Sequence, residues 1–151
     1  MLAEGDKLPK LDLVDDEGRT LSSADLLGGP LVLYFYPKDD TPGCTNEASQ
    51  FRDLYAKFKK KGARIVGVSR DSVSSHQKFK DKYEIPFVLI ADTESKLCDA
   101  MGVIVEKNMY GKRSMGIARS TFLIDEKGKI VRVWPKVKVE DHAAEVLASL
   151  P

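Results

Sequence analysis

Cysteine is scarce in this sequence, with only Cys44 and Cys98 among 151 residues. Two cysteines are too few for the disulfide framework of a small secreted domain. There is no C-x-x-C pair, and His76 and His142 stand far from both cysteines along the chain, so a zinc site has little support. We expect neither a metal nor a cofactor. We also expect a reducing, cytoplasmic compartment, where an unusual cysteine is more often catalytic than structural.

An excess of one charge and a long apolar run are also missing. Lys and Arg together number 24, and Asp and Glu number 23, so no strong field would attract nucleic acid or an anionic membrane. The apolar runs are shorter than a bilayer requires. The start of the chain, residues 1–13, carries charges throughout and lacks the apolar core of a secretory signal. We therefore expect neither nucleic acid nor a membrane as a partner.

What the sequence does contain is an alternation of strands and helices. Short, wholly apolar runs predict buried strands at residues 31–36, 63–69, 87–91 and 120–125. Between them, apolar side chains recur at helical spacing, from Ala48 to Phe58 and from Val73 to Tyr83. This pattern predicts one α/β domain over residues 1–151, with a central sheet flanked by helices.

The two ends of the chain add to this topology. The turn sequence DEKGK at residues 125–129 joins two apolar runs and predicts an antiparallel hairpin. Residues 139–150 predict a terminal amphipathic helix. Near the start, the turn signal DDEG and the capping pattern Ser22-x-x-Asp25 predict a small hairpin and a short helix. A βαβ unit followed by a hairpin and a terminal helix is the order of a thioredoxin-like fold.

The segment around Cys44 has the clearest chemical pattern. After the strand that ends at Tyr36, a loop leads into the sequence TPGC, with Thr41 suited to the N-cap and Pro42 to the first helical position. Cys44 would then be at about the third helical position, where unpaired N–H groups and positive partial charge favour a thiolate. The simpler alternative is a small, buried, inert thiol.

A family resemblance favours the reactive alternative. Pro37-x-x-x-Thr41-x-x-Cys44 matches the active-site signature of peroxiredoxins, and YPKDDTPGCTNEASQFRD resembles the bacterioferritin comigratory protein or peroxiredoxin Q class. Further segments follow in family order, ending with RSTFLIDEKGKI at residues 119–130. The resemblance implies a thioredoxin-like fold with a mixed central sheet and an N-terminal hairpin extension. It also implies thiol-dependent reduction of hydrogen peroxide and organic hydroperoxides.

The resemblance assigns roles to five residues. Cys44 would be the nucleophile that becomes a sulfenic acid, Thr41 would offer a hydroxyl to peroxide or thiolate, and Pro37 would shield the sulfur from water. Arg119 would be the essential cation, because a guanidinium presents several donors in one plane and can contact thiolate and peroxide together. Glu47 would orient this arginine.

Simpler alternatives exist for most of these residues. Thr41 could act only as a helix cap, Glu47 could only complement the helix dipole, and Arg119 could be a surface charge at a strand end. We expect the two histidines, His76 and His142, to be satisfied core or helix-end residues. We expect three methionines to be core or loop residues, namely Met101, Met109 and Met115.

The chain departs from its class at the resolving cysteine. Many members carry a second cysteine five residues after the first, where this chain has Ser49, and the alternative stretch at residues 72–83 has none. Resolution of the sulfenic acid therefore falls to Cys98 or to an outside thiol. Residues 92–103 predict a short helix capped near Thr93 with Cys98 on its apolar side, which favours an inert thiol. We predict one-cysteine behaviour, with thioredoxin, glutaredoxin or a small thiol as reductant.

Two other functions remain open on the sequence alone. A thiol–disulfide oxidoreductase of the same fold is weakened because TPGC lacks the second cysteine of C-x-x-C. A non-catalytic redox sensor or chaperone-like binding protein would use Cys44 as a switch. We expect a monomer, which is common in the class, with a weak dimer as the alternative.

Overall fold

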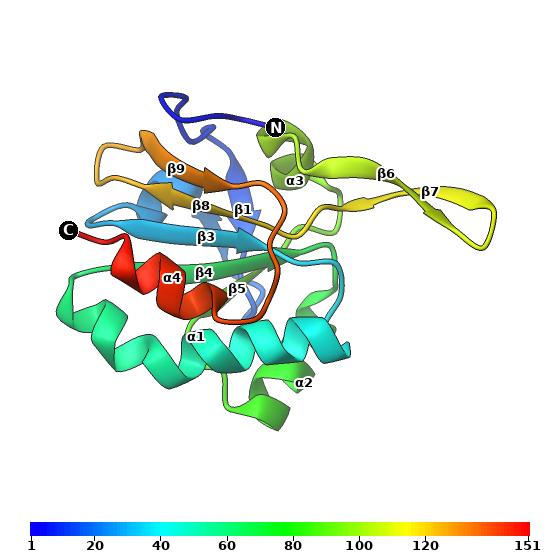
Figure 1. Ribbon diagram of the computed structural model, residues 1–151, viewed down its shortest axis with the longest axis horizontal. Helices are drawn as coiled ribbons and strands as arrows, with labels where there is room; N and C mark the ends of the chain where they lie inside the picture. The colour runs from blue at the N-terminus through cyan, green and yellow to red at the C-terminus, as the bar shows by residue number, and fades with distance from the viewer.

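A computed structural model describes the backbone of residues 1–151 and every side chain except that of Met109. Its centre is a five-stranded sheet with the order β5-β4-β3-β8-β9 (Figure 1). The strands are β3 (Leu31–Phe35), β4 (Arg64–Ser69), β5 (Val88–Ala91), β8 (Ser120–Ile124) and β9 (Ile130–Trp134). β3, β4 and β5 are parallel, and β8 is antiparallel to β3 and β9. The apolar runs predicted these strands, the DEKGK turn predicted the last hairpin, and the family resemblance implied the mixed sheet; all three are confirmed.

Helices cover both faces of this sheet. They are α1 (Pro42–Lys60), α2 (Val73–Tyr83), α3 (Lys96–Met101) and α4 (His142–Ala148). Figure 1 shows α1 and α4 side by side in front of the sheet, with α3 at the back. Across the described residues, each helix is too short or too polar to cross a bilayer.

The N-terminal segment forms the small hairpin that its turn signal predicted. β1 (Asp12–Val14) pairs with β2 (Thr20–Ser22), and the short 3-10 helix η1 (Ser23–Leu26) follows. Ser22 and Asp25 make the expected capping box, because the Asp25 carboxylate accepts from the Ser22 N–H at 3.0 Å while the Ser22 hydroxyl oxygen accepts from the first helical turn.

The sheet separates two apolar layers. Successive side chains of a strand point to opposite faces, so Val32 and Tyr34 enter the layer beneath α1 and α4, whereas Leu33 enters the layer beneath α3. Cys44 belongs to the first layer and Cys98 to the second. The two thiols are therefore buried over opposite faces of the central sheet.

The predicted start of α3 is wrong by two residues. The helix begins at Lys96 with Ser95 as its N-cap, and not near Thr93. The residues before it form a turn in which the Ser95 N–H donates to the Asp92 carbonyl at 2.9 Å. The Asp92 carboxylate then accepts from two N–H groups of the first helical turn at 2.8 and 3.1 Å. A side chain further upstream thus satisfies the donors that Thr93 was expected to cap.

A third hairpin was not predicted. β6 (Ile104–Met109) and β7 (Lys112–Ile117) pair with each other and project from the body of the sheet in Figure 1. Met115 is 59% exposed on β7, so its assignment to the core or a loop is wrong, whereas Met101 is buried as expected. The side chain of Met109 lies outside the described part of the chain. Because most of this hairpin faces solvent, no apolar run marks it in the sequence.

Candidate active site

The candidate site lies where β3 leads into the first turn of α1. Thr41 is the N-cap residue, Pro42 the first helical residue and Cys44 the third, as predicted. The Thr41 side chain nevertheless makes no capping hydrogen bond to the helix. Its hydroxyl turns toward the loop and donates to the Lys38 carbonyl at 2.9 Å. Thr41 therefore supports the loop before the helix rather than the helix end.

The sulfur of Cys44 lies beside the guanidinium of Arg119. Nη2 donates to Sγ at 3.4 Å, and Nη1 of the same guanidinium donates to Glu47 Oε1 at 2.8 Å. Arg119 stands just before β8, while Cys44 and Glu47 occupy successive turns of α1. The structure brings these three predicted residues into one contact, with a cation facing both the thiol and a carboxyl group.

Burial controls the electrostatics of this contact. Cys44 and Glu47 are each 1% exposed. Burial raises the pKa of Glu47 to about 7, against the lowering effects of the Arg119 charge and hydrogen bond. Burial also opposes the charge of Arg119, but Glu47 and Cys44 outweigh it and raise the pKa of the guanidinium. Arg119 is thus held cationic, while Glu47 can carry a proton near neutral pH.

Gly43 makes room for the arginine. A Cβ at this position would lie 3.1 Å from Nη2 of Arg119, closer than most real Cβ contacts. The guanidinium can therefore reach the sulfur over the first helical turn because residue 43 has no side chain. This steric role could not be predicted from spacing, because it depends on a residue from a distant strand.

Pro37 is the second residue of the loop between β3 and α1 and is exposed. Its shielding of the sulfur stays a prediction.

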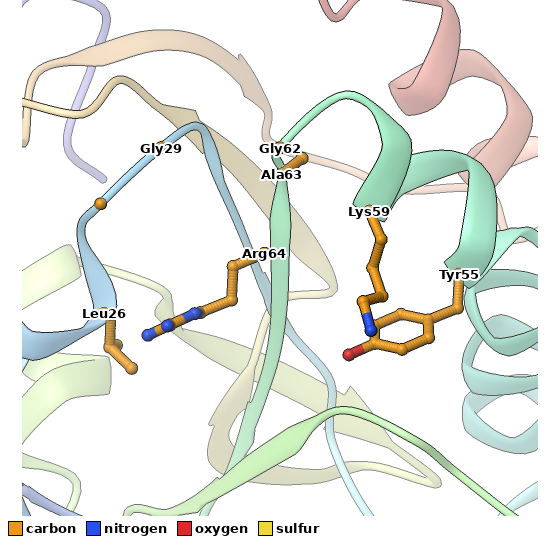
Figure 2. Close-up of a pocket in the computed structure, with 8 residues that line it drawn as sticks. Leu26, Gly29, Tyr55, Lys59, Gly62, Ala63 and Arg64 are labelled. Carbon is orange, nitrogen blue, oxygen red and sulfur yellow. The ribbon is translucent and has the colours of Figure 1, made fainter.

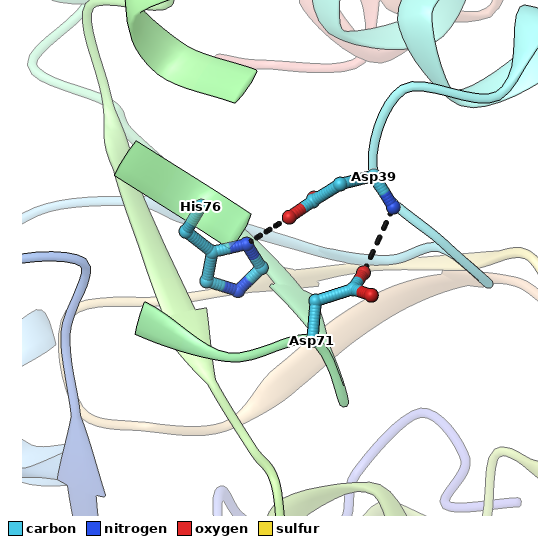
Figure 3. Close-up of side chains that lie close together, drawn as sticks. All are labelled: Asp39, Asp71 and His76. Atoms are coloured by element: carbon cyan, nitrogen blue, oxygen red, sulfur yellow. Dashed lines mark hydrogen bonds and ion pairs between the residues drawn. The ribbon is translucent and has the colours of Figure 1, made fainter. Parts of the chain in front are cut away.

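Two residues after Pro37, Asp39 is buried, and its carboxylate Oδ2 lies 2.7 Å from Nδ1 of His76 on α2 (Figure 3). His76 is the satisfied core histidine that was expected, but its acidic partner in the loop was missed. Sequence gives no signal for it beyond the acidic pair in PKDDT.

The same cluster has to be considered as a metal site. Asp39, Asp71 and His76 place three potential ligand atoms within 4.8 Å of one another. Each atom already has a hydrogen-bond partner: Asp71 Oδ2 accepts from the Asp39 N–H at 2.8 Å and from the Ser69 hydroxyl at 2.6 Å. The other His76 nitrogen, Nε2, lies 2.9 Å from the Ile90 carbonyl oxygen. We therefore assign this cluster to hydrogen bonding.

The second buried histidine is also structural, as predicted. His142 begins α4, and its Nε2 lies 2.8 Å from the Thr121 hydroxyl. Burial is the main cause that lowers the pKa of His142 to about 4. This side chain is neutral at neutral pH.

The cavity in Figure 2 lies away from the thiol. Gly29 and Arg64 line it from the starts of β3 and β4, and Tyr55 and Lys59 line it from α1. Cys44 follows the opposite end of β3. The Nζ of Lys59 lies 5.4 Å from the centroid of the Tyr55 ring, so this cation is already engaged with the wall of the cavity. The cavity adds no group to the candidate site.

Comparison with known proteins relates this geometry to one family. Residues 4–133 match the AhpC/TSA family. The chain is 51% identical to "Peroxiredoxin Bcp" of Bacillus subtilis, over 97% of the chain and 93% of the relative. It is 56% identical to "Peroxiredoxin Bcp" of Xanthomonas campestris over 80% of the chain and 75% of that relative.

Solved structures agree with these relatives. Peroxiredoxin Q of Xanthomonas campestris has a TM-score of 0.88 and 51% identity, over 93% of this chain and 89% of that one. A mutant of PrxQ from Xylella fastidiosa has a TM-score of 0.94 and 42% identity, over 99% and 96%. The thioredoxin-like fold with its mixed sheet and N-terminal hairpin is thereby confirmed.

Proposed function

The chain belongs to the AhpC/TSA family, within its Bcp or peroxiredoxin Q group of thiol peroxidases, and on that premise we propose that Cys44 is the residue that peroxide oxidises. The observation that carries this assignment is the 3.4 Å contact between Arg119 Nη2 and the Cys44 sulfur. A cation at this distance favours the thiolate over the thiol. The third helical position adds the positive end of the α1 dipole.

The reaction transfers one oxygen atom to the sulfur. The Cys44 thiolate attacks the terminal oxygen of ROOH, a sulfur–oxygen bond forms and the oxygen–oxygen bond breaks. The sulfur is oxidised by two electrons to a sulfenic acid, and the departing alkoxide takes up a proton as ROH. Negative charge passes from sulfur through two oxygens, so fixed donors along that line lower the barrier.

The neighbouring side chains supply those donors. Arg119 contacts the sulfur directly and can extend a further N–H to the peroxide. Glu47 holds the guanidinium through Nη1 at 2.8 Å and acts as a positioning residue. In our proposal the Thr41 hydroxyl leaves the Lys38 carbonyl to donate to the peroxide, and Pro37 limits the access of water.

Cys98 is poorly placed to resolve the oxidised thiol. It lies in the apolar layer on the other face of the sheet from Cys44, and a disulfide needs Cα atoms within about 7 Å. Burial and the Asp92 carboxylate raise the pKa of the Cys98 thiol far above its usual range, which removes the attacking thiolate. With Ser49 at the usual resolving position, an outside thiol is the remaining nucleophile.

The outside thiol closes the cycle in two steps. One thiol displaces water from the sulfenic acid to form a mixed disulfide, and a second releases the Cys44 thiol. We propose thioredoxin, glutaredoxin or a small thiol as this reductant, acting on a monomeric, single-domain enzyme in the cytoplasm. We propose hydrogen peroxide and organic hydroperoxides as substrates. Organic hydroperoxides are supported by a solved structure of the Xanthomonas campestris bacterioferritin comigratory protein, which is described in connection with the alkyl peroxide reduction activity of that protein.

The test is catalytic peroxide consumption with dithiothreitol and, separately, with the thioredoxin system. Cys44→Ser should abolish turnover, because the hydroxyl does not supply a thiolate. Cys98→Ser is the matched control and should keep most of the wild-type rate. Substantial turnover by Cys44→Ser would contradict the assignment. Stoichiometric oxidation of the wild type without turnover under any donor would favour the redox sensor.

A further inference from the structure

The loop that precedes Cys44 is anchored to α2 by a buried carboxylate. Asp39 Oδ2 lies 2.7 Å from His76 Nδ1 (Figure 3). The same oxygen accepts from the Ser75 hydroxyl at 2.8 Å. Its other oxygen, Oδ1, accepts from the Tyr36 hydroxyl at 2.6 Å. One side chain of the loop thus receives three hydrogen bonds, two of them from the first turn of α2.

The His76–Asp39 contact has the geometry of an ion pair. Nε2 of His76 faces the Ile90 carbonyl oxygen at 2.9 Å, and a carbonyl can only accept, so Nε2 carries a proton. Nδ1 lies 2.7 Å from an Asp39 carboxylate oxygen, and an ionised carboxylate can only accept, which favours a second proton on the ring. The side chains are 0% and 3% exposed. An isolated charge at such depth would be costly, so each ion depends on the other.

The surrounding charges favour this state. The groups that face His76 are the Asp39 carboxylate from the loop, the Asp71 carboxylate after β4 and the Tyr36 hydroxyl after β3. Burial opposes the imidazolium, but the hydrogen bond and charge of Asp39, the Ile90 carbonyl and the Asp71 charge together raise the pKa of His76.

Other links between the loop and α2 are weaker. Asp40 accepts from Lys82 Nζ at 2.9 Å and from the Tyr83 hydroxyl. The Lys82 and Asp40 side chains are 60% and 44% exposed, and exposed pairs contribute little. The buried pair of Asp39 and His76 is therefore the main anchor of the loop on this side.

Anchoring affects the two half-reactions in opposite ways. The loop runs directly into the turn that presents Cys44, so a fixed loop keeps the sulfur beside Arg119 for attack on peroxide. Cys44 is only 1% exposed, so an outside thiol can reach its oxidised sulfur only after this turn opens. A contact that holds the loop closed promotes oxidation and opposes reduction.

We propose that the His76–Asp39 ion pair is a positioning element for the peroxidase, which holds the loop before Cys44 against α2 and so sets the balance between peroxide attack and reduction by thiol. This inference rests on the proposed function of Cys44. It adds two residues that do not touch the reacting atoms.

Two substitutions at one position separate the contact from general packing. His76→Gln can keep a donor near Nε2 for Ile90 but loses the donor to Asp39. His76→Asn can keep a donor near Nδ1 for Asp39 but loses the charge. His142→Gln is the control, because it alters a buried histidine that bonds to Thr121 and not to the loop.

The two half-reactions are measured separately, as oxidation of reduced protein by hydrogen peroxide and as reduction of the sulfenic acid by dithiothreitol. His76→Gln should slow oxidation and speed reduction, each by about tenfold, the effect of losing one charged hydrogen bond. His76→Asn should lie between this variant and the wild type. The control should change neither rate by more than about twofold.

Several results would overturn the inference. It is wrong if His76→Gln slows both half-reactions equally, or if it matches His142→Gln in both. If His76→Gln does not fold, the test is made on the wild-type protein. The titration of His76 is followed by NMR, and raising the pH through this titration should lower the hydrogen-exchange protection of the Asp39 amide. Unchanged protection would contradict the anchor. If the wild type itself consumes no peroxide, the proposed function fails instead.

Discussion

Arg119 places Nη2 3.4 Å from the sulfur of Cys44, although the two residues are 75 positions apart in the chain. The first turn of α1 and the segment before β8 meet only because β3 and β8 are neighbours in the sheet. The cation therefore depends on the fold for its position, and the reactivity of the thiol depends on the cation.

Arg119→Met tests the cation directly. Methionine keeps much of the apolar stem but loses the charge and the donors, so we expect Cys44 to react more slowly with alkylating agents and its oxidation by hydrogen peroxide to slow about 100-fold, the effect of losing one oxyanion donor. Stopped-flow oxidation and the pH dependence of Cys44 alkylation measure these effects. Arg132→Met, on β9, is the control. If the pH dependence of Cys44 alkylation is unchanged in Arg119→Met, this result would count against the role of Arg119 as the cation that activates the thiol.

Gly43→Ala tests the space that the guanidinium needs. The new Cβ would lie 3.1 Å from Nη2, and the flexible arginine side chain would shift before the helix backbone does. We expect slower oxidation by about tenfold, in proportion to a partly lost donor, with a change in unfolding free energy below about 1 kcal/mol. Wild-type oxidation kinetics in this variant would show that Arg119 tolerates displacement.

Glu47→Gln tests the protonation of the buried carboxyl group. Its folded-state pKa is raised from 4.5 to about 7, so the stability that protonated Glu47 contributes is complete below the lower value and is lost as the pH rises through the higher one. Glutamine does not titrate. The variant should therefore gain about 3 kcal/mol relative to the wild type across this range, as measured by urea unfolding at several pH values. A difference that stays constant with pH would contradict the raised pKa.

His142→Gln tests a lowered pKa, the opposite of the raised pKa of Glu47. The folded-state pKa of His142 falls from 6.5 to about 4, so the stability of the neutral form is present above the higher value and is lost as the pH falls through the lower one. The variant lacks this loss, so its unfolding free energy should decline less than that of the wild type on acidification across the range. Parallel declines would mean that His142 takes up its proton freely in the folded protein.

Sequence predicted the parts of the fold that are buried. The strands from Leu31 and from Ser120 are buried along their whole length, so their apolar runs are unmistakable. The β6–β7 hairpin faces solvent along most of its length and has no such run. The start of α3 was misplaced because the Asp92 carboxylate bonds to the first helical turn across an intervening turn, which places the N-cap at Ser95 instead of near Thr93.

The candidate site was predicted only in part, because its residues come from segments that lie far apart in the sequence. The helix-start position of Cys44 follows from local sequence, but the approach of Arg119 was implied only by the family signature, since spacing alone would make it a surface charge. The contact of His76 with Asp39 could not be predicted, because it depends on how α2 packs against a loop 37 positions away in sequence.

The intact mass of protein treated with equimolar peroxide, without reductant, tests the central claim most directly. Cys44 is predicted to gain a single oxygen atom, which a sulfenic-acid reagent traps on the Cys44 peptide and which Cys44→Ser does not acquire. A loss of two hydrogens, with a Cys44–Cys98 peptide from a monomer, would contradict one-cysteine chemistry. An oxygen on Cys98 instead of Cys44 would contradict the assignment of the nucleophile itself.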